Sequence, residues 1–180
     1  MTLGFPSPAS TNGTAMLRWW TVADLACVRT ASEEGRIHEY TSIPKRFTRE
    51  DGKAWISRQQ ERTRAGRGWS LAIGDARTAE ALGCIVLMLR PQAGVAGLEY
   101  WLVPEAQGRG YATRAVTLLT TWGLETETLG RIEAWVEPGN DASVRVLSNC
   151  GFEYEGRPRS FLQFTTRRTD ALVFSRIGEP

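Results

Sequence analysis

The chain has 180 residues, of which 42% are hydrophobic and 23% are charged, as expected for one globular domain with a substantial core. The net charge of +2 argues against a nucleic-acid-binding protein, since such proteins carry a marked excess of basic residues. Cys27, Cys84 and Cys150 are far apart and odd in number, and His38 is the only histidine, so neither a disulfide framework nor a metal site is expected. The unpaired thiols favour a cytoplasmic location, and no apolar stretch is long enough to cross a membrane.

The N-terminal part of the chain predicts a tail followed by alternating strands and helices. Residues 1–15 are expected to be disordered because they are rich in Ser, Thr, Pro and Gly, whereas 16–180 should form a single domain. Thr21 and Thr48 are suited to cap helices, since a hydroxyl oxygen can accept from a free amide of the first turn. The expected elements are a strand over 16–20, a helix over 22–34, a loop over 36–44 and a helix over 48–64.

Apolar segments separated by turn residues predict the remaining elements. A hairpin is expected over 69–90, followed by a strand over 97–103 that Pro104 ends. Apolar residues at helical spacing predict a helix over 111–125. The chain should continue with a strand over 131–136, a helix over 141–149, and strands over 152–155, 161–164 and 171–177. This order predicts an α/β (α+β) fold, with a mixed central sheet and helices on both faces.

The segment between the strand over 97–103 and the helix over 111–125 is suited to bind an anion. Gly108 and Gly110 allow the backbone to turn sharply and to approach a ligand closely. The helix that begins at Tyr111 offers unpaired N–H groups and the positive end of its dipole, which suit a pyrophosphate, and Arg109 could add a charged contact. The segment is neither a dinucleotide-binding GxGxxG motif nor a Walker loop. A tight turn without a ligand remains the structural alternative.

Several motifs together resemble one family. Residues 107–112, Gln-Gly-Arg-Gly-Tyr-Ala, resemble the pyrophosphate signature of the GNAT superfamily of N-acetyltransferases. Residues 100–104 are similar to the strand that leads into this signature in the Rim-type branch, which is typified by ribosomal-protein acetyltransferases. Residues 140–147, followed by 151–156, resemble a second Rim-type signature. With the opening segment that starts at Leu17, the resemblance covers about residues 16–177.

The resemblance implies a GNAT fold with splayed central strands and acetyl-CoA as cosubstrate. The strand over 100–103 would part from the strand that begins near Arg131, and the gap would take the pantetheine arm. A backbone N–H near Leu102 or Val103 would polarise the thioester carbonyl. Asn140 would hold the cofactor arm, and Ser143 would donate a proton to the leaving thiolate. The pyrophosphate would bind to Gln107, Gly108, Arg109, Gly110, Tyr111 and Ala112.

The reaction also needs a group that accepts a proton from the attacking ammonium. Glu99 is the first candidate because it lies on the key strand, on the opposite face from Tyr100. Rim-type relatives usually carry glycine here, so Glu99 could equally be a substrate-recognition carboxylate or a solvated charge. Glu133 on the adjacent strand is the second candidate. A chain of water molecules to bulk solvent is the third possibility.

Other residues have structural interpretations. Asn140 could simply cap a helix, and Ser143 could bond to its own helix backbone. Cys150 is expected to be a buried structural thiol, and His38 an exposed loop residue. Most of the tryptophans should be core or pocket wall, and Trp101 and Trp135 lie on the two strands expected to splay. Four arginines flank the last hairpin and could attract an acidic acceptor or ribosomal RNA: Arg157, Arg159, Arg167 and Arg168.

The sequence therefore predicts direct acetyl transfer from acetyl-CoA to a primary amine, either a protein N-terminus or a small amine. Neither a metal nor a covalent enzyme intermediate is required. A non-catalytic acyl-CoA-binding or regulatory module on the same fold is one alternative, and a general nucleotide-phosphate binder is another. Many members of this fold form homodimers, but the sequence does not reveal an interface.

Overall fold

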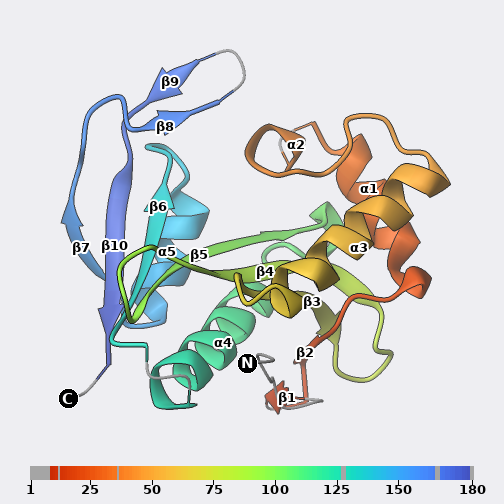
Figure 1. Cartoon of the computed structure of the whole chain (residues 1–180), viewed down its shortest axis with the longest axis horizontal. Helices are drawn as coiled ribbons and strands as arrows, with labels where there is room; N and C mark the ends of the chain where they lie inside the picture. The colour runs from red at the N-terminus through yellow and green to blue at the C-terminus, as the bar shows by residue number, and fades with distance from the viewer. Residues whose placement is uncertain (1–8, 12, 36, 127–128, 165–166, 179–180) are drawn as a thin grey trace.

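The computed structural model describes residues 9–11, 13–35, 37–126, 129–164 and 167–178, and one eight-stranded sheet runs through them (Figure 1). The strand order is β1-β2-β3-β4-β5-β6-β10-β7. Neighbouring strands are antiparallel except β5 and β6, which are parallel. The strands are β1 (Ala9–Thr11), β2 (Ala15–Arg18), β3 (Gly68–Asp75), β4 (Ala81–Leu89), β5 (Val95–Leu102), β6 (Arg131–Val136), β7 (Glu153–Gly156) and β10 (Leu172–Ile177).

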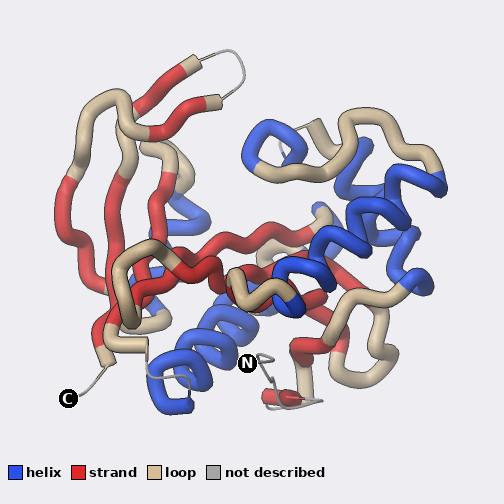
Figure 2. The backbone as a smooth tube through the Cα atoms, viewed as in Figure 1, coloured by secondary structure: helices blue, strands red, loops and turns tan. Residues whose placement is uncertain are grey.

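Helices cover both faces of this sheet (Figure 2). One face carries α1 (Leu25–Glu33), the short α2 (Ile37–Tyr40) and α3 (Arg49–Arg64). The other carries α4 (Tyr111–Thr126) and α5 (Asp141–Asn149), which contact each other. Two 3-10 turns, η1 (Val22–Asp24) and η2 (Pro104–Ala106), precede α1 and α4. The predicted α/β (α+β) fold with a mixed central sheet is confirmed.

Tryptophan clusters mark the two faces. Trp101 of β5 packs towards Trp20 and Trp55, with ring centroids 6.3 and 6.2 Å away, on the face that carries α3. On the opposite face Trp69 of β3 meets Trp122 of α4 edge to face, with centroids 4.9 Å apart. Large aromatic side chains therefore fill the core on both sides, as expected from the composition. None of the helices in the described residues has the length and apolar character of a membrane span.

The central strands part as expected. β5 and β6 pair over only three positions, Val95↔Arg131, Ala96↔Ile132 and Gly97↔Glu133. Beyond Gly97, β5 stays paired with β4 up to Leu102, and β6 stays paired with β10 up to Val136. The sheet thus divides into two groups of strands that diverge after the last shared pair (Figures 1 and 2). Beyond this pair, no strand of the described residues lies against the inner edges of β5 and β6.

The predicted N-cap of α3 is confirmed, whereas α1 begins later than predicted. The amide of Asp51 donates to Thr48 Oγ1 at 3.0 Å, as predicted for an N-cap. At the other helix, the Asp24 carboxylate accepts from the Thr21 amide at 2.8 Å, and Arg18 pairs with the same carboxylate at 2.6 Å. Because Asp24 closes a 3-10 turn, the α-helix begins at Leu25 rather than at Val22.

Three further expectations need correction. The tail predicted over 1–15 contains strand β1, which pairs with β2, while residues 1–8 and 12 lie outside the described residues. The loop predicted over 36–44 contains α2. The strand predicted over 161–164 is only β8 (Leu162–Gln163), which pairs with β9 (Arg168–Thr169) in a separate two-stranded sheet. Each of these short elements is held by a partner distant in sequence or by a tight turn, which local pattern does not reveal.

Candidate active site

The inner edge of β5 offers backbone groups to the gap. The amide of Val103 donates to the carbonyl of Leu82 at 2.9 Å, so it belongs to the ladder with β4. Successive amides of a strand point to opposite edges, which directs the Leu102 N–H away from β4 and towards the gap. The Leu102 carbonyl points the same way and accepts from Gln107 Nε2 at 3.1 Å. Of Leu102 and Val103, Leu102 is therefore the one whose N–H points into the gap.

The pairing of β5 with β4 excludes one of the two expected oxyanion donors. The sequence left open whether Leu102 or Val103 supplies the N–H. The Val103 amide is already hydrogen-bonded and faces β4, so it is not available to a thioester carbonyl. Val103 is also buried and follows the last residue of β5, where the chain leaves the sheet.

The loop before α4 presents a row of amides. Gly108 and Gly110 have φ values of 69° and 81°, a left-handed conformation that strongly favours glycine. In the described part of the chain, no carbonyl or side chain accepts from the amides of residues 108–113. These amides lie at the N-terminus of a 16-residue helix, where the dipole favours an anion. The segment expected to bind a pyrophosphate thus has the donors that such a group needs.

Side chains of this loop support it rather than point into it. Gln107 holds the end of β5 through the Leu102 carbonyl. Arg109 turns back towards the Glu105 carbonyl at 3.4 Å and lies over the Tyr111 ring at 5.6 Å. Tyr111 is buried, and its hydroxyl donates to Asp75 Oδ2 at 2.5 Å. Gln107, Arg109 and Tyr111 therefore support the backbone that carries the row of amides, and the Ala112 amide belongs to this row.

Arg114, in the first turn of α4, is a residue beside this loop that sequence reasoning missed. A Cβ added to Gly110 would lie 2.3 Å from Arg114 Nη1, so the guanidinium rests directly on the glycine. Its position in the first turn of α4 brings a positive charge to the row of amides. A basic residue four positions after the second glycine was the available signal.

The start of α5 faces the gap from the side of α4. Asn140 caps this helix, since its Oδ1 accepts from the Ser143 amide at 3.1 Å, so the structural interpretation of Asn140 is confirmed. The Ser143 hydroxyl has no hydrogen-bond partner among the described residues. Tyr100 of β5 reaches across to the Ser143 carbonyl, with its hydroxyl 3.5 Å away. Burial raises the pKa of Tyr100 to about 12, so this phenol stays protonated at neutral pH.

The two acidic candidates lie on the opposite face. Glu99 is exposed on the same face of β5 as Trp101, and in the described chain no side chain pairs with it. Glu133 on β6 is instead held by Arg90 at 3.1 Å and by Arg131 at 3.8 Å. Because both of its oxygens already contact cations, Glu133 is poorly placed to accept a proton from a substrate. Glu99 and Ser143 therefore lie on opposite sides of the gap.

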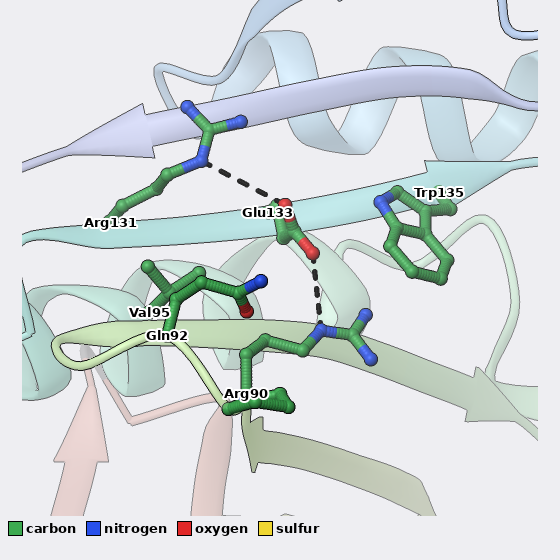
Figure 3. Close-up of a pocket in the computed structure, with 7 residues that line it drawn as sticks. Arg90, Gln92, Val95, Arg131, Glu133 and Trp135 are labelled. Atoms are coloured by element: carbon green, nitrogen blue, oxygen red, sulfur yellow. Dashed lines mark hydrogen bonds and ion pairs between the residues drawn. The ribbon is translucent and has the colours of Figure 1, made fainter.

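A hollow opens on the face of Glu133 (Figure 3). Its volume is about 580 Å³, and it lies beside the narrow end of the gap, not over the amide row before α4. Trp135 is 38% exposed at its rim and contacts Phe161 edge to face, with ring centroids 4.7 Å apart. Arg90 lies under Trp135, with Cζ 4.2 Å from the ring centroid. Sequence reasoning singled out Trp135 and missed Arg90, because Arg90 directly follows β4 in the sequence and reaches β6 only in the folded chain.

Side chains of α2, β6 and the β8–β9 hairpin meet at the wide end of the gap. The Tyr40 hydroxyl donates to Glu137 Oε2 at 2.7 Å, and Arg167 pairs with Glu137 Oε1. Phe164 contacts Tyr40 edge to face, with centroids 5.0 Å apart, and Arg167 lies over the Phe164 ring at 4.5 Å. We call these four residues the clasp. The clasp joins three segments that are distant in sequence across the face that carries Glu99.

Cys150 and His38 do not contribute reactive groups to the gap. Cys150 is buried, its sulfur lies 3.5 Å from Thr117 Oγ1, and burial raises the pKa of its thiol, as expected for a structural cysteine. His38 lies in α2 rather than in an exposed loop, is partly buried, and its Nδ1 has no partner among the described residues. Within the described ranges, no group of three or more His, Cys, Asp or Glu side chains could hold a metal ion.

Solved structures share this architecture. The ribosomal alpha-N-protein acetyltransferase RimL in complex with coenzyme A superposes with a TM-score of 0.84 at 17% identity, covering 96% of this chain and 98% of that chain. A ribosomal-protein alanine acetyltransferase from Vibrio fischeri gives a TM-score of 0.79 at 23% identity, covering 97% and 98%. At these identities, the similarity establishes the fold.

Sequence comparison identifies the family. The uncharacterized N-acetyltransferase p20 of Bacillus licheniformis is 35% identical over 101 residues, or 56% of this chain. The chain spans 57%, 63% and 64% of the length of three curated Bacillus relatives that it matches. The family model for the acetyltransferase (GNAT) domain matches residues 15–153, which is well over half of the sequence. The chain therefore belongs to the GNAT acetyltransferase family.

Proposed function

We propose that this protein is an acetyl-CoA-dependent N-acetyltransferase that transfers the acetyl group directly to a primary amine. The main support is two stretches of backbone that meet at the gap: the amides of residues 108–113, which have no acceptor in the described chain, and the inner edge of β5 at Tyr100 and Leu102, beside which no described strand lies. The first suits a diphosphate, and the second suits an extended chain that carries amides. Coenzyme A has both groups, joined in that order, with its thiol at the far end.

Three groups around the gap would each perform one part of the reaction. The Leu102 N–H stabilises the oxyanion that forms on the thioester carbonyl when the amine attacks. Glu99 accepts the proton that the ammonium loses, directly or through water. Ser143 donates its hydroxyl proton to the departing sulfur and regains one from solvent. The new C–N bond replaces the C–S bond, and the products are the acetylated amine and CoA thiol.

A protein N-terminus and a small amine are the two acceptor classes. The name of RimL states that it acts on a protein alpha-amino group, and the shared fold brings this class to the present chain as a candidate. The clasp favours an acceptor that can pass beneath it, which means a small molecule or an extended peptide end rather than a folded surface.

Thiol release from acetyl-CoA with a panel of amines tests the proposal, together with calorimetric measurement of CoA affinity. Gly108→Ala should weaken CoA binding on the order of tenfold, because a side chain at φ 69° displaces the amides that flank it. Gly66→Ala is the matched control, since Gly66 has φ 66°, has open space around it and lies between α3 and β3 rather than in the amide row. Equal CoA affinity in both variants would contradict the proposed site.

Two alternatives give different results in the same assays. A non-catalytic acyl-CoA-binding module would bind CoA with the same dependence on Gly108 but would release no thiol with any amine. A general nucleotide-phosphate binder would bind ATP and NAD as tightly as CoA, since it would not use the edge of β5. We expect CoA to compete clearly better than either nucleotide.

A further inference from the structure

The point where β5 and β6 separate is occupied by an arginine that directly follows a third strand, β4. Arg90 follows β4, and its side chain crosses Gly97, the last residue of β5 that pairs with β6. A Cβ added to Gly97 would lie 2.4 Å from Arg90 Nη2, 2.7 Å from Cζ and 2.9 Å from Nε. The guanidinium therefore lies flat against the backbone of β5, in space that only glycine leaves open.

The other face and one edge of this guanidinium are also held. The Trp135 ring covers it, with the ring centroid 4.2 Å from Cζ, and Nε donates to Glu133 Oε1 at 3.1 Å. Figure 3 shows the terminal nitrogens directed away from Glu133 and towards the Trp135 end of β6. A guanidinium fixed on three sides has already lost its conformational freedom, so a ligand that binds to it does not bear that cost.

The terminal nitrogens are donors without an acceptor. In the described residues, neither Nη1 nor Nη2 of Arg90 has a hydrogen-bond partner. The side chain is 23% exposed and opens onto the hollow that Figure 3 displays. Arg131 lines the same hollow, but both of its terminal nitrogens bond to Glu155, at 2.7 and 2.5 Å. Of these two arginines, only Arg90 therefore presents a free pair of donors.

The free donors lie close to the proposed proton acceptor. Gly97 and Glu99 are two residues apart on β5 and share a face, which separates their Cα atoms by roughly 7 Å. A guanidinium with two parallel N–H groups matches a carboxylate, and the Glu99 carboxylate matches an ammonium. A compound that carries an amine and a carboxylate a few bonds apart can contact both.

We propose that Arg90, seated between Gly97 and Trp135, binds a carboxylate of the acceptor and so selects small amino acids and related zwitterionic amines. This inference rests on the proposed acetyltransferase function and specifies its acceptor. The carboxylate would sit against the Nη edge of Arg90, with the amine directed towards Glu99 and the gap. Amines without a carboxylate would leave that edge unpaired.

The test compares matched acceptors. Thiol release is measured with the twenty amino acids, with their carboxamides and with the corresponding decarboxylated amines. We expect at least one amino acid to have kcat/KM about tenfold or more above that of its carboxamide. Equal values for every acid and amide pair, with turnover present, would overturn this inference and leave the proposed function intact. Absence of turnover with every amine, despite CoA binding, would overturn the proposed function as well.

Variants of Arg90 and its neighbours then test whether Arg90 causes the preference for acids over amides. Arg90→Lys keeps the charge but loses the paired donors, and Gly97→Ala displaces the guanidinium without changing it. Both should raise KM for the amino acid about tenfold and leave KM for acetyl-CoA unchanged. Arg131→Lys is the matched control, because its donors are already bound to Glu155, and it should affect acid and amide equally. An Arg90→Lys variant that retains the full acid preference would contradict the assignment.

Discussion

The hydroxyl of Tyr111 lies 2.5 Å from Oδ2 of Asp75 and joins the first residue of α4 to the last residue of β3. Asp75 also accepts from the amides of Arg77 and Thr78, at 2.9 and 3.1 Å. The row of amides proposed to hold the diphosphate is therefore anchored to the β3–β4 turn by one side chain. The Tyr111 side chain therefore supports the row through this anchor, while the Tyr111 amide is itself part of the row.

The anchor predicts a specific dependence of stability on pH. The Tyr111 hydroxyl, with the amides of Arg77 and Thr78, lowers the pKa of Asp75 to about 2, from an ordinary value of 3.8. A carboxyl with a lowered folded-state pKa contributes stability that is fully present above about pH 4 and is lost as the pH falls towards 2. Tyr111→Phe should weaken this loss. Urea unfolding at a series of pH values checks it, and an unchanged slope between pH 4 and 2 would contradict the anchor.

Removing the Leu102 N–H alone should slow the chemical step. Replacing the amide of Leu102 by an ester removes the N–H that faces the gap and leaves the side chain in place. We expect kcat to fall on the order of 100-fold or more, with little change in CoA affinity, as for other lost oxyanion donors. The same replacement at Val103 removes a ladder bond to Leu82 instead. That control should lower stability and spare kcat, and the reverse pattern would refute the assignment.

Ser143 and Asn140 predict separable effects at the start of α5. Ser143→Ala should lower kcat at least tenfold without changing the stability, because the cap uses the Ser143 amide and not its hydroxyl. Asn140→Ala should lower the unfolding free energy by about 1 kcal/mol, whereas Asn140→Asp should keep the cap. Urea titrations and steady-state kinetics separate the two roles. A Ser143→Ala enzyme with normal kcat would remove Ser143 as the proton donor.

Loosening the clasp should make the β8–β9 hairpin more mobile and should admit larger acceptors. Tyr40→Phe removes the hydrogen bond to Glu137 and keeps the ring contact with Phe164. Amide hydrogen exchange in the β8–β9 hairpin should become faster, and bulky amines should gain in kcat/KM relative to small ones. Ser42→Ala is a suitable control, since Ser42 is exposed two residues away and has no side-chain bond in the described chain. Unchanged exchange in Tyr40→Phe would show that the clasp does not hold the hairpin.

Local signals in the sequence predicted those parts of the site that one segment builds alone. The paired glycines after Pro104 predicted the amide row before α4, and Thr48 predicted the start of α3, because both structures depend on neighbouring residues. The parting of β5 and β6 came from resemblance rather than from composition, and the strand register confirms it.

Features that depend on strand register or on contacts between distant residues could not be predicted from local sequence signals. The direction of the Val103 amide follows from its pairing with Leu82, and a shift of one residue would have reversed the roles of Val103 and Leu102. Arg90 crosses Gly97 to reach β6, a contact over 43 residues of sequence. The clasp joins Tyr40 to Glu137 over 97 residues, so no local pattern indicates it.

A crystal structure with coenzyme A bound is the decisive test of the proposed site. We expect diphosphate oxygens within hydrogen-bond distance of amides in residues 108–113, with the pantetheine arm along the inner edge of β5 and the sulfur near Leu102 and Ser143. Coenzyme A bound elsewhere, or a gap between β5 and β6 that closes in solution and admits no ligand, would contradict it.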